Sequence, residues 1–463
     1  MKLLKYILVT TAVLFISNKS SFAQQVNTLY FMNSVPQAIQ YNPAKKSEYK
    51  WSVSFPVTNI SATVYNQFNY NDVTYQENNK TYLDIDGFLN KLDKTNEQYS
   101  SISSELFGIY FQKDRFGVNL TANVSTYEHL TYSKELFSTI LRGPAQEGTL
   151  GKTQDFSSIA NVYAFYDVSL GGNYKVNDKL VVGARMKLMF GTYNVKAQIN
   201  GSLLQGEGAN MPITISGDVD IDANGLGNIV DADGQIEIDD EEPLNSLSEF
   251  SNVGFAVDLG AVYQYDEKLT FEASVRNLGA IFWQDDRKYS YNASLADLSY
   301  SGMDPSDILN GETDDSFPTF SDSLVFKPTD GSDSKNTTLP TTINLAATYE
   351  VWEHSTAGAL FSQTFYEGEY YPSLTLSIDK QFGKFFGLGL SYTMDKGSYA
   401  NVGALVSFGF PGFQMYVVSD NLLTAGLQWD KAKTANMRFG VNLPFGKVEN
   451  KDAIDRKLEK RLN

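Results

Sequence analysis

Apolar and polar residues alternate along this chain in many segments of strand length. The clearest segment lies between Lys179 and Thr192, where the even-numbered residues are Leu180, Val182, Ala184, Met186, Leu188 and Phe190. The odd-numbered residues of the same segment include Arg185 and Lys187. Because successive side chains of a strand point to opposite faces, the segment predicts a β-strand with one apolar face and one charged face.

The connections between these segments are alternately short and long. Very short turns are expected at 113–114, 176–178, 266–267 and 353–355, whereas 199–251 and 281–340 are long and polar. Bacterial outer-membrane barrels combine an even number of strands with short periplasmic turns and long extracellular loops. We therefore expect an all-β fold, a transmembrane antiparallel β-barrel of about 14 strands over residues 51–446. The segments 211–221 and 420–429 could raise the count to about 16, but we interpret them as hairpin or loop outside the membrane.

The first residues have the pattern of a secretory signal peptide. Lys2 and Lys5 precede an apolar run from Tyr6 to Ile16, and small residues stand at Ser21 and Ala23. The run is about half as long as the roughly 20 apolar residues of a membrane-spanning helix. We therefore predict a cleaved signal peptide over residues 1–23, and a multi-pass barrel of the bacterial outer membrane with both termini in the periplasm.

The composition of the chain and the positions of its histidines argue against several classes of function. The chain has no cysteine, which excludes disulfides, thiol catalysis and lipidation of a terminal cysteine. Its net charge of −17 disfavours a nucleic-acid partner. Of its two histidines, His129 is expected near the outer rim of a strand and His354 in a short turn, so a serine hydrolase would lack a base. We predict no enzymatic activity, no catalytic residue and outer-membrane lipid as the surrounding partner.

Charged residues fall on the face of the strands that should point into the barrel. The predicted lumen-facing set is Asp167, Arg185, Lys187, Asp258, Glu272, Arg276, Glu350, Asp379 and Arg438. In a wide, water-filled barrel these side chains could form a selectivity lining. In a narrow barrel they would pair across the lumen and hold a plug, because buried charges are seldom left unpaired. We favour the second interpretation.

One acidic segment has the spacing of a calcium-binding loop. The candidate ligands are Asp220, Asp222, Asn224, Asp231, Asp233 and Glu237. Oxygen ligands at positions 1, 3 and 5, a glycine at position 6 and a carboxylate at position 12 would surround one hard cation. Position 12 is the short Asp231, however, and the flanking residues 213–215 and 236–238 look like strands. The alternatives are a structural calcium ion, with no other cofactor, and a solvated acidic loop.

Two features near the ends of the barrel sequence leave alternatives open. Pro56 and Pro444 lie in the first and last strands, which are neighbours in a closed barrel, and proline cannot donate a hydrogen bond to the sheet. They could open a lateral gap for an apolar solute, or could sit at periplasmic strand ends where pairing stops. The charged tail, residues 447–463, could form a short periplasmic helix or a solvated end.

The segment 29–44 ends in Asn42-Pro43-Ala44 and resembles the stretch before the first strand of FadL-like outer-membrane transporters. In particular the chain is similar to an uncharacterised Bacteroidota family of such barrels. The phrases at 182–187, 274–279 and 419–423 add to this resemblance. It implies a fourteen-stranded barrel in which residues 24–50 fold inward as a hatch, with Asn42, Pro43 and Ala44 as hatch residues.

The resemblance leads to two functional hypotheses. The first is a FadL-like barrel that passively admits a hydrophobic or amphipathic small molecule across the outer membrane. The second is a scaffold or receptor barrel that does not transport, similar to accessory barrels of the type IX secretion system, whose extracellular loops bind secreted or surface proteins. The hatch-like start and the proline pair favour the first hypothesis, and the two long acidic loops favour the second.

Overall fold

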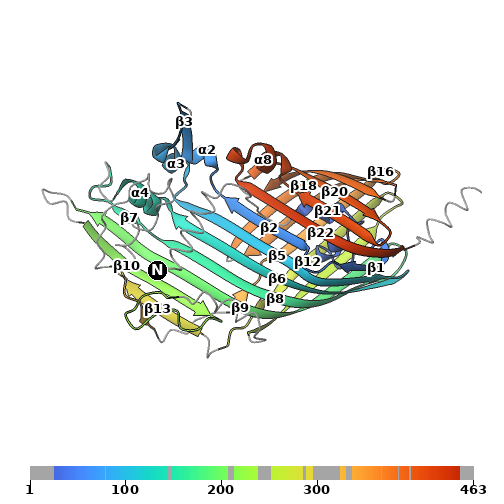
Figure 1. Ribbon diagram of the computed structural model, residues 1–463, viewed down its shortest axis with the longest axis horizontal. Helices are drawn as coiled ribbons and strands as arrows, with labels where there is room; N and C mark the ends of the chain where they lie inside the picture. The colour runs from blue at the N-terminus through green and yellow to red at the C-terminus, as the bar shows by residue number, and fades with distance from the viewer. Residues whose placement is uncertain are drawn as a thin grey trace, which may run out of the picture.

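A computed structural model describes residues 26–448, except 79, 144–147, 207–212, 238–251, 285–287, 296–323, 330–335, 367, 384 and 396–397. It contains a closed antiparallel barrel of 14 strands, as predicted (Figure 1). The wall consists of β1 (Tyr49–Ser54) continued by β2 (Asn59–Asn66), β5 (Thr95–Gln112), β6 (Phe116–Ser133), β8 (Ser158–Lys175), β9 (Leu180–Gln205), β11 (Val253–Gln264), β12 (Leu269–Ile281), β16 (Thr341–Trp352), β17 (Ser355–Tyr366), β18 (Glu369–Phe382), β19 (Phe386–Asp395), β20 (Ser398–Phe410), β21 (Phe413–Ser419) and β22 (Thr434–Lys447). The predicted signal peptide and most of the predicted tail lie outside the described residues.

The barrel closes between its first and last strands. β22 pairs with β1, with Trp51 opposite Phe445, and also with β2, with Ile60 opposite Phe439. Closure leaves the wall without an unpaired edge. The first wall strand is interrupted between Ser54 and Asn59, and the interruption contains Pro56.

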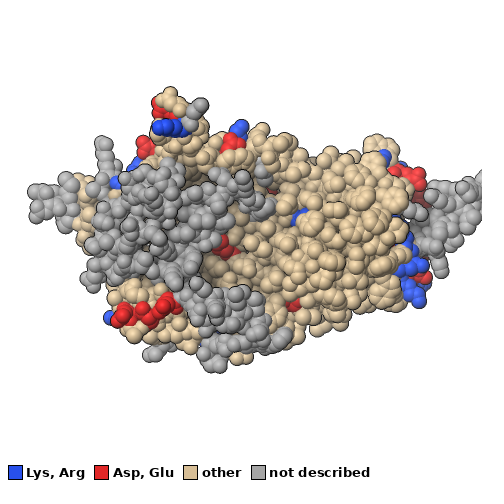
Figure 2. Space-filling model, viewed as in Figure 1, with Lys and Arg blue, Asp and Glu red and all other residues tan. Residues whose placement is uncertain are grey.

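The two faces of the wall differ as the sequence pattern predicts. On β9, Val182 and Met186 are 39% and 70% exposed, whereas Val181 and Arg185 are 9% and 2% exposed. The outer surface around the middle of the barrel carries few charges, and the visible charged side chains gather toward the two ends (Figure 2). No helix among the described residues is long and apolar enough to cross a membrane.

The two ends of the barrel have different connections. At one end, called the turn end, short turns follow β5, β8, β11, β16 and β20. At the other, called the loop end, five connections are long, whereas two residues each connect β17 to β18 and β19 to β20. The long connections carry α2 (Tyr70–Val73), β3 (Thr74–Glu77), β4 (Lys80–Leu83), α3 (Ile85–Lys91), α4 (Lys134–Arg142), β7 (Thr153–Asp155), β15 (Thr337–Thr338), α8 (Leu422–Leu427) and η5 (Trp429–Lys431).

The loop end also carries a sheet with its own apolar core. β9 is 26 residues long and continues beyond the wall, where it pairs with β10 (Ile213–Asn224). β10 in turn pairs with β13 (Lys288–Ser294), and β13 with β14 (Lys327–Pro328). Buried residues of this extension include Leu203, Ile221, Tyr291, Leu295 and Phe326. The long connection predicted from 199 onward begins later than expected, because β9 extends to Gln205. β10 forms a hairpin with β9 outside the wall, which agrees with the hairpin or loop expected at 211–221.

The residues before β1 fill the lumen near the turn end. They form two short helices, η1 (Asn27–Phe31) and η2 (Pro36–Gln40), inside the barrel (Figure 1). Leu29, Tyr30 and Val35 are fully buried, and they belong to one apolar cluster with the wall residues Leu360 and Leu405. We call residues 26–48 the hatch.

Glycines in the wall let the hatch backbone approach closely. A Cβ atom on Gly183 of β9 would overlap the backbone of Pro43, and one on Gly260 of β11 would overlap the side-chain oxygen of Asn42. The Asn42-Pro43 segment therefore fits against the wall only because these two positions lack side chains.

We predict that Gly260→Ala destabilises the seated hatch by about 1–3 kcal/mol, the usual effect of adding a methyl group to a packed site. The measurement is the temperature at which the folded band of the barrel converts to the unfolded band in detergent electrophoresis, and it should fall. Gly389→Ala is the control, because a Cβ there would lie 3.5 Å from Leu405 and 3.6 Å from Met32 in ordinary contact. Equal midpoints for the two variants would contradict the proposed fit.

Candidate functional site

A cavity lies in the lumen of the barrel, and the hatch bounds it on the side of the turn end. Asn27, Gln40 and Tyr41 form part of its lining, and the rest comes from the wall strands. Serine, threonine, asparagine and tyrosine predominate among the lining residues, and the purely apolar ones are Phe165, Met189 and Pro340. The cavity is thus lined mainly by polar side chains.

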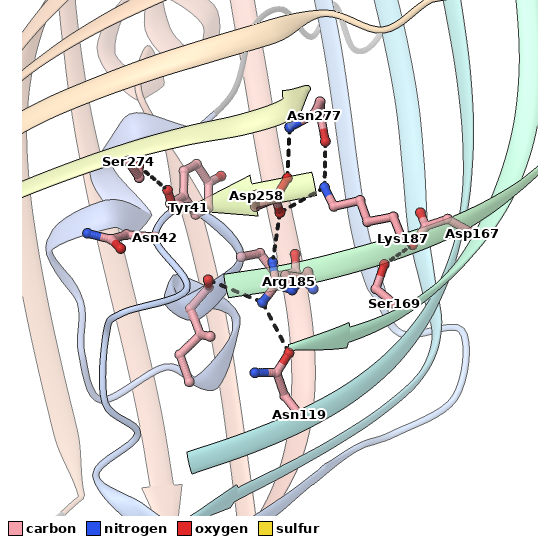
Figure 3. Close-up of polar contacts among 12 residues, drawn as sticks. Tyr41, Asn42, Asn119, Asp167, Ser169, Arg185, Lys187, Asp258, Ser274 and Asn277 are labelled. Carbon is pink, nitrogen blue, oxygen red and sulfur yellow. Dashed lines mark hydrogen bonds and ion pairs between the residues drawn. The ribbon is translucent and has the colours of Figure 1, made fainter. Parts of the chain in front are cut away.

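A buried charge cluster connects β9 and β11 to the hatch (Figure 3). Asp258 of β11 lies directly opposite Arg185 in the strand register and is fully buried. It forms ion pairs with Arg185 at 3.4 Å and with Lys187 at 3.0 Å. Nη1 of Arg185 faces Asp258, and Nη2 donates to the carbonyl oxygen of Ile39 in the hatch and to the side-chain oxygen of Asn119, at 3.2 Å each. Arg185 therefore links the wall to the hatch.

A second buried ion pair lies between the hatch and β12. The Nζ atom of Lys45 is 2.9 Å from a carboxylate oxygen of Glu272, and both side chains are at most 5% exposed. Glu272 also accepts a hydrogen bond from the Tyr30 hydroxyl at 3.0 Å. Lys45 lies 4.2 Å from the centre of the Tyr30 ring, so the ammonium group is surrounded by hatch and wall. Sequence patterning located Glu272 but not its partner Lys45, because the hatch has no strand alternation.

A third contact lies beside the interruption between β1 and β2. Glu105 of β5 accepts hydrogen bonds from Gln37 and Gln40 of the hatch, and from the Tyr110 hydroxyl at 2.7 Å. Gln37 also donates to Ser54 at 3.0 Å and to Asn442 at 2.8 Å. The hatch thus covers the inner side of the interruption with polar groups.

The two prolines differ in their position relative to this interruption. Pro444 lies within β22 opposite Ser52, whereas Pro56 lies in the interruption itself, between β1 and β2. The wall remains bridged here, because the Phe55 amide and the Asn59 side chain both donate to the carbonyl oxygen of Val441, at 2.9 and 3.3 Å.

Asp420, after β21, anchors the beginning of the hatch. Its carboxylate accepts hydrogen bonds from the backbone amides of Asn27 at 2.6 Å and Thr28 at 2.8 Å. Burial raises the pKa of Asp420 to about 6, although these hydrogen bonds oppose the shift. The sequence phrase at 419–423 contributed to the family resemblance but gave no indication of this role.

The other predicted charges occupy different surroundings. Asp167 accepts hydrogen bonds from Asn123 and Ser169, and the Arg276 guanidinium lies 4.8 Å from the Tyr41 ring centre. Arg438 donates to Gln40 of the hatch at 2.9 Å and to Tyr416 at 3.1 Å. Two further members of the predicted set differ in exposure: Asp379 is half-buried, and Glu350 is exposed near the turn end.

His129 lies toward the loop end of β6, as expected, but its side chain belongs to the lumen-facing set, which the sequence pattern did not predict. It is 6% exposed, and its Nε2 atom is 3.3 Å from the Tyr371 hydroxyl and 3.7 Å from Glu97. The inward face of β6 continues to Ser133. His354 is exposed in the turn between β16 and β17, as expected.

The predicted calcium loop is not a loop. Asp220, Asp222 and Asn224 lie on β10, where Asn292 donates to Asp220 at 2.8 Å and Ser290 to Asp222 at 2.6 Å. A straight strand cannot wrap its oxygens around one ion. The remaining candidates follow the strand: Asp231 accepts from the amides of Asp233 and Gln235, and the Glu237 amide bonds to Ile229. Within the described ranges, no group of three or more His, Cys, Asp and Glu side chains could hold a metal ion.

We predict that Lys45→Met destabilises the barrel by about 3–5 kcal/mol, because it leaves the Glu272 carboxylate buried without its partner. The double variant with Glu272→Leu should recover much of this loss, since it removes the stranded charge. Urea-induced unfolding in detergent measures the free energy. Lys447→Met is a matched control, because its ion pair with Glu48 is about 40% exposed and should contribute less than about 1 kcal/mol. Similar losses for both single variants would contradict the role given to Lys45.

Comparison with solved structures finds outer-membrane channels of similar overall fold. The toluene transporter TbuX of Ralstonia pickettii is 11% identical with a TM-score of 0.42, and the match covers 89% of this chain and 94% of that chain. A FadL homologue of Pseudomonas aeruginosa is 10% identical with a TM-score of 0.39, over 89% and 94% of the two chains. A mutant of the monoaromatic hydrocarbon channel TodX is 9% identical with a TM-score of 0.46, over 88% and 93%.

A search of curated proteins found no sequence match. Residues 43–420, from Pro43 in the hatch to the anchoring Asp420, match a Family of unknown function (DUF5723). The match covers most of the chain and nearly the whole barrel wall, and the protein therefore belongs to the DUF5723 family.

Proposed function

We propose that this protein is a passive outer-membrane channel for an amphipathic small molecule. The loop end would face the outside of the cell, the turn end the periplasm, and the apolar outer face the lipid. The observation that carries the proposal is the cavity whose floor is the hatch itself, because a solute in the cavity touches the element that closes the barrel.

The lining favours a solute with a polar group over a pure hydrocarbon. A hydrocarbon would remove water from the hydroxyl and amide groups of the lining without replacing their hydrogen bonds, which is unfavourable. Tyr65, Tyr99 and Tyr127 add aromatic faces to the same cavity, and these faces can cover an apolar body. An amphipathic solute satisfies both kinds of lining.

Gln40 connects the cavity with the wall interruption. It lines the cavity, accepts from Arg438 at 2.9 Å and donates to Glu105 beside the interruption. A solute whose polar group replaces Gln40 as the partner of Arg438 would favour a displaced hatch, since a ligand stabilises the conformation that it binds best. The displaced hatch would open either the turn end or the interrupted wall.

We predict that covalent attachment of the hatch to the wall abolishes uptake. The hydroxyls of Thr28 and Ser391 lie 2.6 Å apart, and the chain has no native cysteine. The double variant Thr28→Cys/Ser391→Cys should therefore form a disulfide on oxidation. In cells lacking other channels, uptake of labelled decanoate should fall at least about tenfold in the oxidised variant and recover with reductant, because the hatch must move. Toluene should enter more slowly than decanoate.

Each single-cysteine variant is the matched control for oxidation and should retain uptake. If the oxidised double variant admits decanoate as fast as the reduced one, passage does not require hatch movement. If the wild-type protein gives no uptake above cells without it, the transport proposal fails.

The extension at the loop end favours a second function, a scaffold or receptor for surface proteins. Unlike a flexible loop, β9, β10, β13 and β14 form a folded sheet with a buried core, and this sheet stands beyond the wall. Such a rigid surface suits protein recognition. Native-membrane purification followed by mass measurement of the intact complex tests this alternative. Two results together would favour the scaffold over the channel. The first is a stoichiometric partner that binds the wild-type protein but not a variant without residues 213–224, and the second is the absence of uptake in both proteins.

A further inference from the structure

Three polar side chains meet in the lumen toward the loop end. They are Glu97 of β5, His129 of β6 and Tyr371 of β18. The Tyr371 hydroxyl donates to a carboxylate oxygen of Glu97 at 2.9 Å. The Nε2 atom of His129 is 3.3 Å from that hydroxyl and 3.7 Å from the same carboxylate oxygen. The side chains of His129 and Glu97 are 7% and 16% exposed, so the three atoms form a triangle largely shielded from water.

The triangle has the dimensions of one face of a metal coordination shell. A point equidistant from the three atoms lies about 1.9 Å from each, and a point slightly above their plane reaches the roughly 2.0–2.2 Å of zinc–nitrogen and zinc–oxygen bonds. Neighbouring ligands of a tetrahedral ion with bonds of about 2 Å are about 3.3 Å apart, which falls within the range of the three separations. An ion of this size therefore fits among the three atoms.

The chemistry of the three groups suits a divalent transition-metal ion. Imidazole and carboxylate are ordinary zinc ligands, and a tyrosine oxygen is the iron ligand of some haem proteins. The ion would replace the proton that Tyr371 donates to Glu97, and this proton would pass to water. The carboxylate and the phenolate then supply two negative charges, and His129 binds as a neutral ring. Ion and ligands together are neutral, which favours a site that is largely buried.

The three groups come from opposite sides of the barrel. β5 and β6 are neighbours in the wall, whereas β18 pairs with β17 and β19 on the far side of the ring. Tyr366 of β17 makes a similar crossing, because its ring is 5.5 Å from that of His129 and its hydroxyl accepts from Asn161 of β8 at 3.3 Å. Tyr371 also lines the cavity. The two sides of the wall therefore meet here, and wall strands rather than long loops hold the three groups in place.

We propose that Glu97, His129 and Tyr371 form a binding site for a divalent first-row transition-metal ion, represented by Zn²⁺. With three protein ligands, a tetrahedral ion keeps a fourth position for water. The bound ion ties β5 and β6 to β18 across the lumen, at the edge of the cavity. Without the ion, the same three groups keep only the contacts described above.

Zinc titration of the purified barrel, freed of metal with a chelator, tests the proposal. The wild-type protein should bind one Zn²⁺ per chain tightly in isothermal titration calorimetry. Zn²⁺ should also raise the temperature at which the folded band converts to the unfolded band, because an ion that binds only the folded state stabilises it. Co²⁺ should give the visible absorption of a four-coordinate ion. His129→Gln and Tyr371→Phe should each weaken Zn²⁺ binding at least about tenfold, the smallest effect usual even for changes around the ligands.

Two matched controls should bind Zn²⁺ as the wild type does. His354→Gln removes the other histidine, which is exposed in the turn between β16 and β17. Tyr366→Phe keeps the ring beside His129 and removes only a hydroxyl outside the triangle. The wild-type titration decides the matter even if a ligand variant does not fold. Absence of stoichiometric binding to the wild type, binding that persists in Tyr371→Phe, or binding lost in His354→Gln would each overturn the proposal.

Discussion

The structure depends on pairing the charges that the barrel wall turns inward. Arg185, Asp258 and Glu272 are buried and the Lys187 side chain is 12% exposed, and a buried charge is unfavourable without a partner. The hatch completes their pairing, through the Ile39 carbonyl to Arg185 and through Lys45 to Glu272. Without the hatch, buried charges of the wall would lack some of their partners, and the same holds for Lys45 of the hatch without the wall. The hatch is therefore a structural part of the barrel.

This dependence also explains why the hatch can act as a closure. Its contacts with the wall are hydrogen bonds and ion pairs to side chains such as Glu105, Asp420 and Arg438, together with one apolar cluster. Polar contacts of this kind can be exchanged for contacts with a solute at a modest change in free energy, whereas an apolar interface would have to be exposed to water. The polar cavity beside them is where that exchange would begin.

The sequence predicts the wall better than it predicts the site. Alternation identifies the inward face of β9, with Arg185 and Lys187, because the side-chain period of a strand is local and regular. It does not place Lys45, Gln37 or Asp420, since the hatch and the connections have no period and their partners are far away in the chain. It also missed the continuation of β9 into the sheet at the loop end, because strand alternation is the same inside and outside the wall.

The contacts that seat the hatch have a consequence for assembly. Gln37 bonds to Asn442 across 405 residues, and Asn27 bonds to Asp420 across 393. The segment that is synthesised first therefore acquires its last partners only when β22 reaches β1 and the ring closes. Contacts of such long sequence separation are slow to form. The hatch can therefore reach its final set of contacts only after the ring has closed, so the seating of the hatch is a late step of assembly.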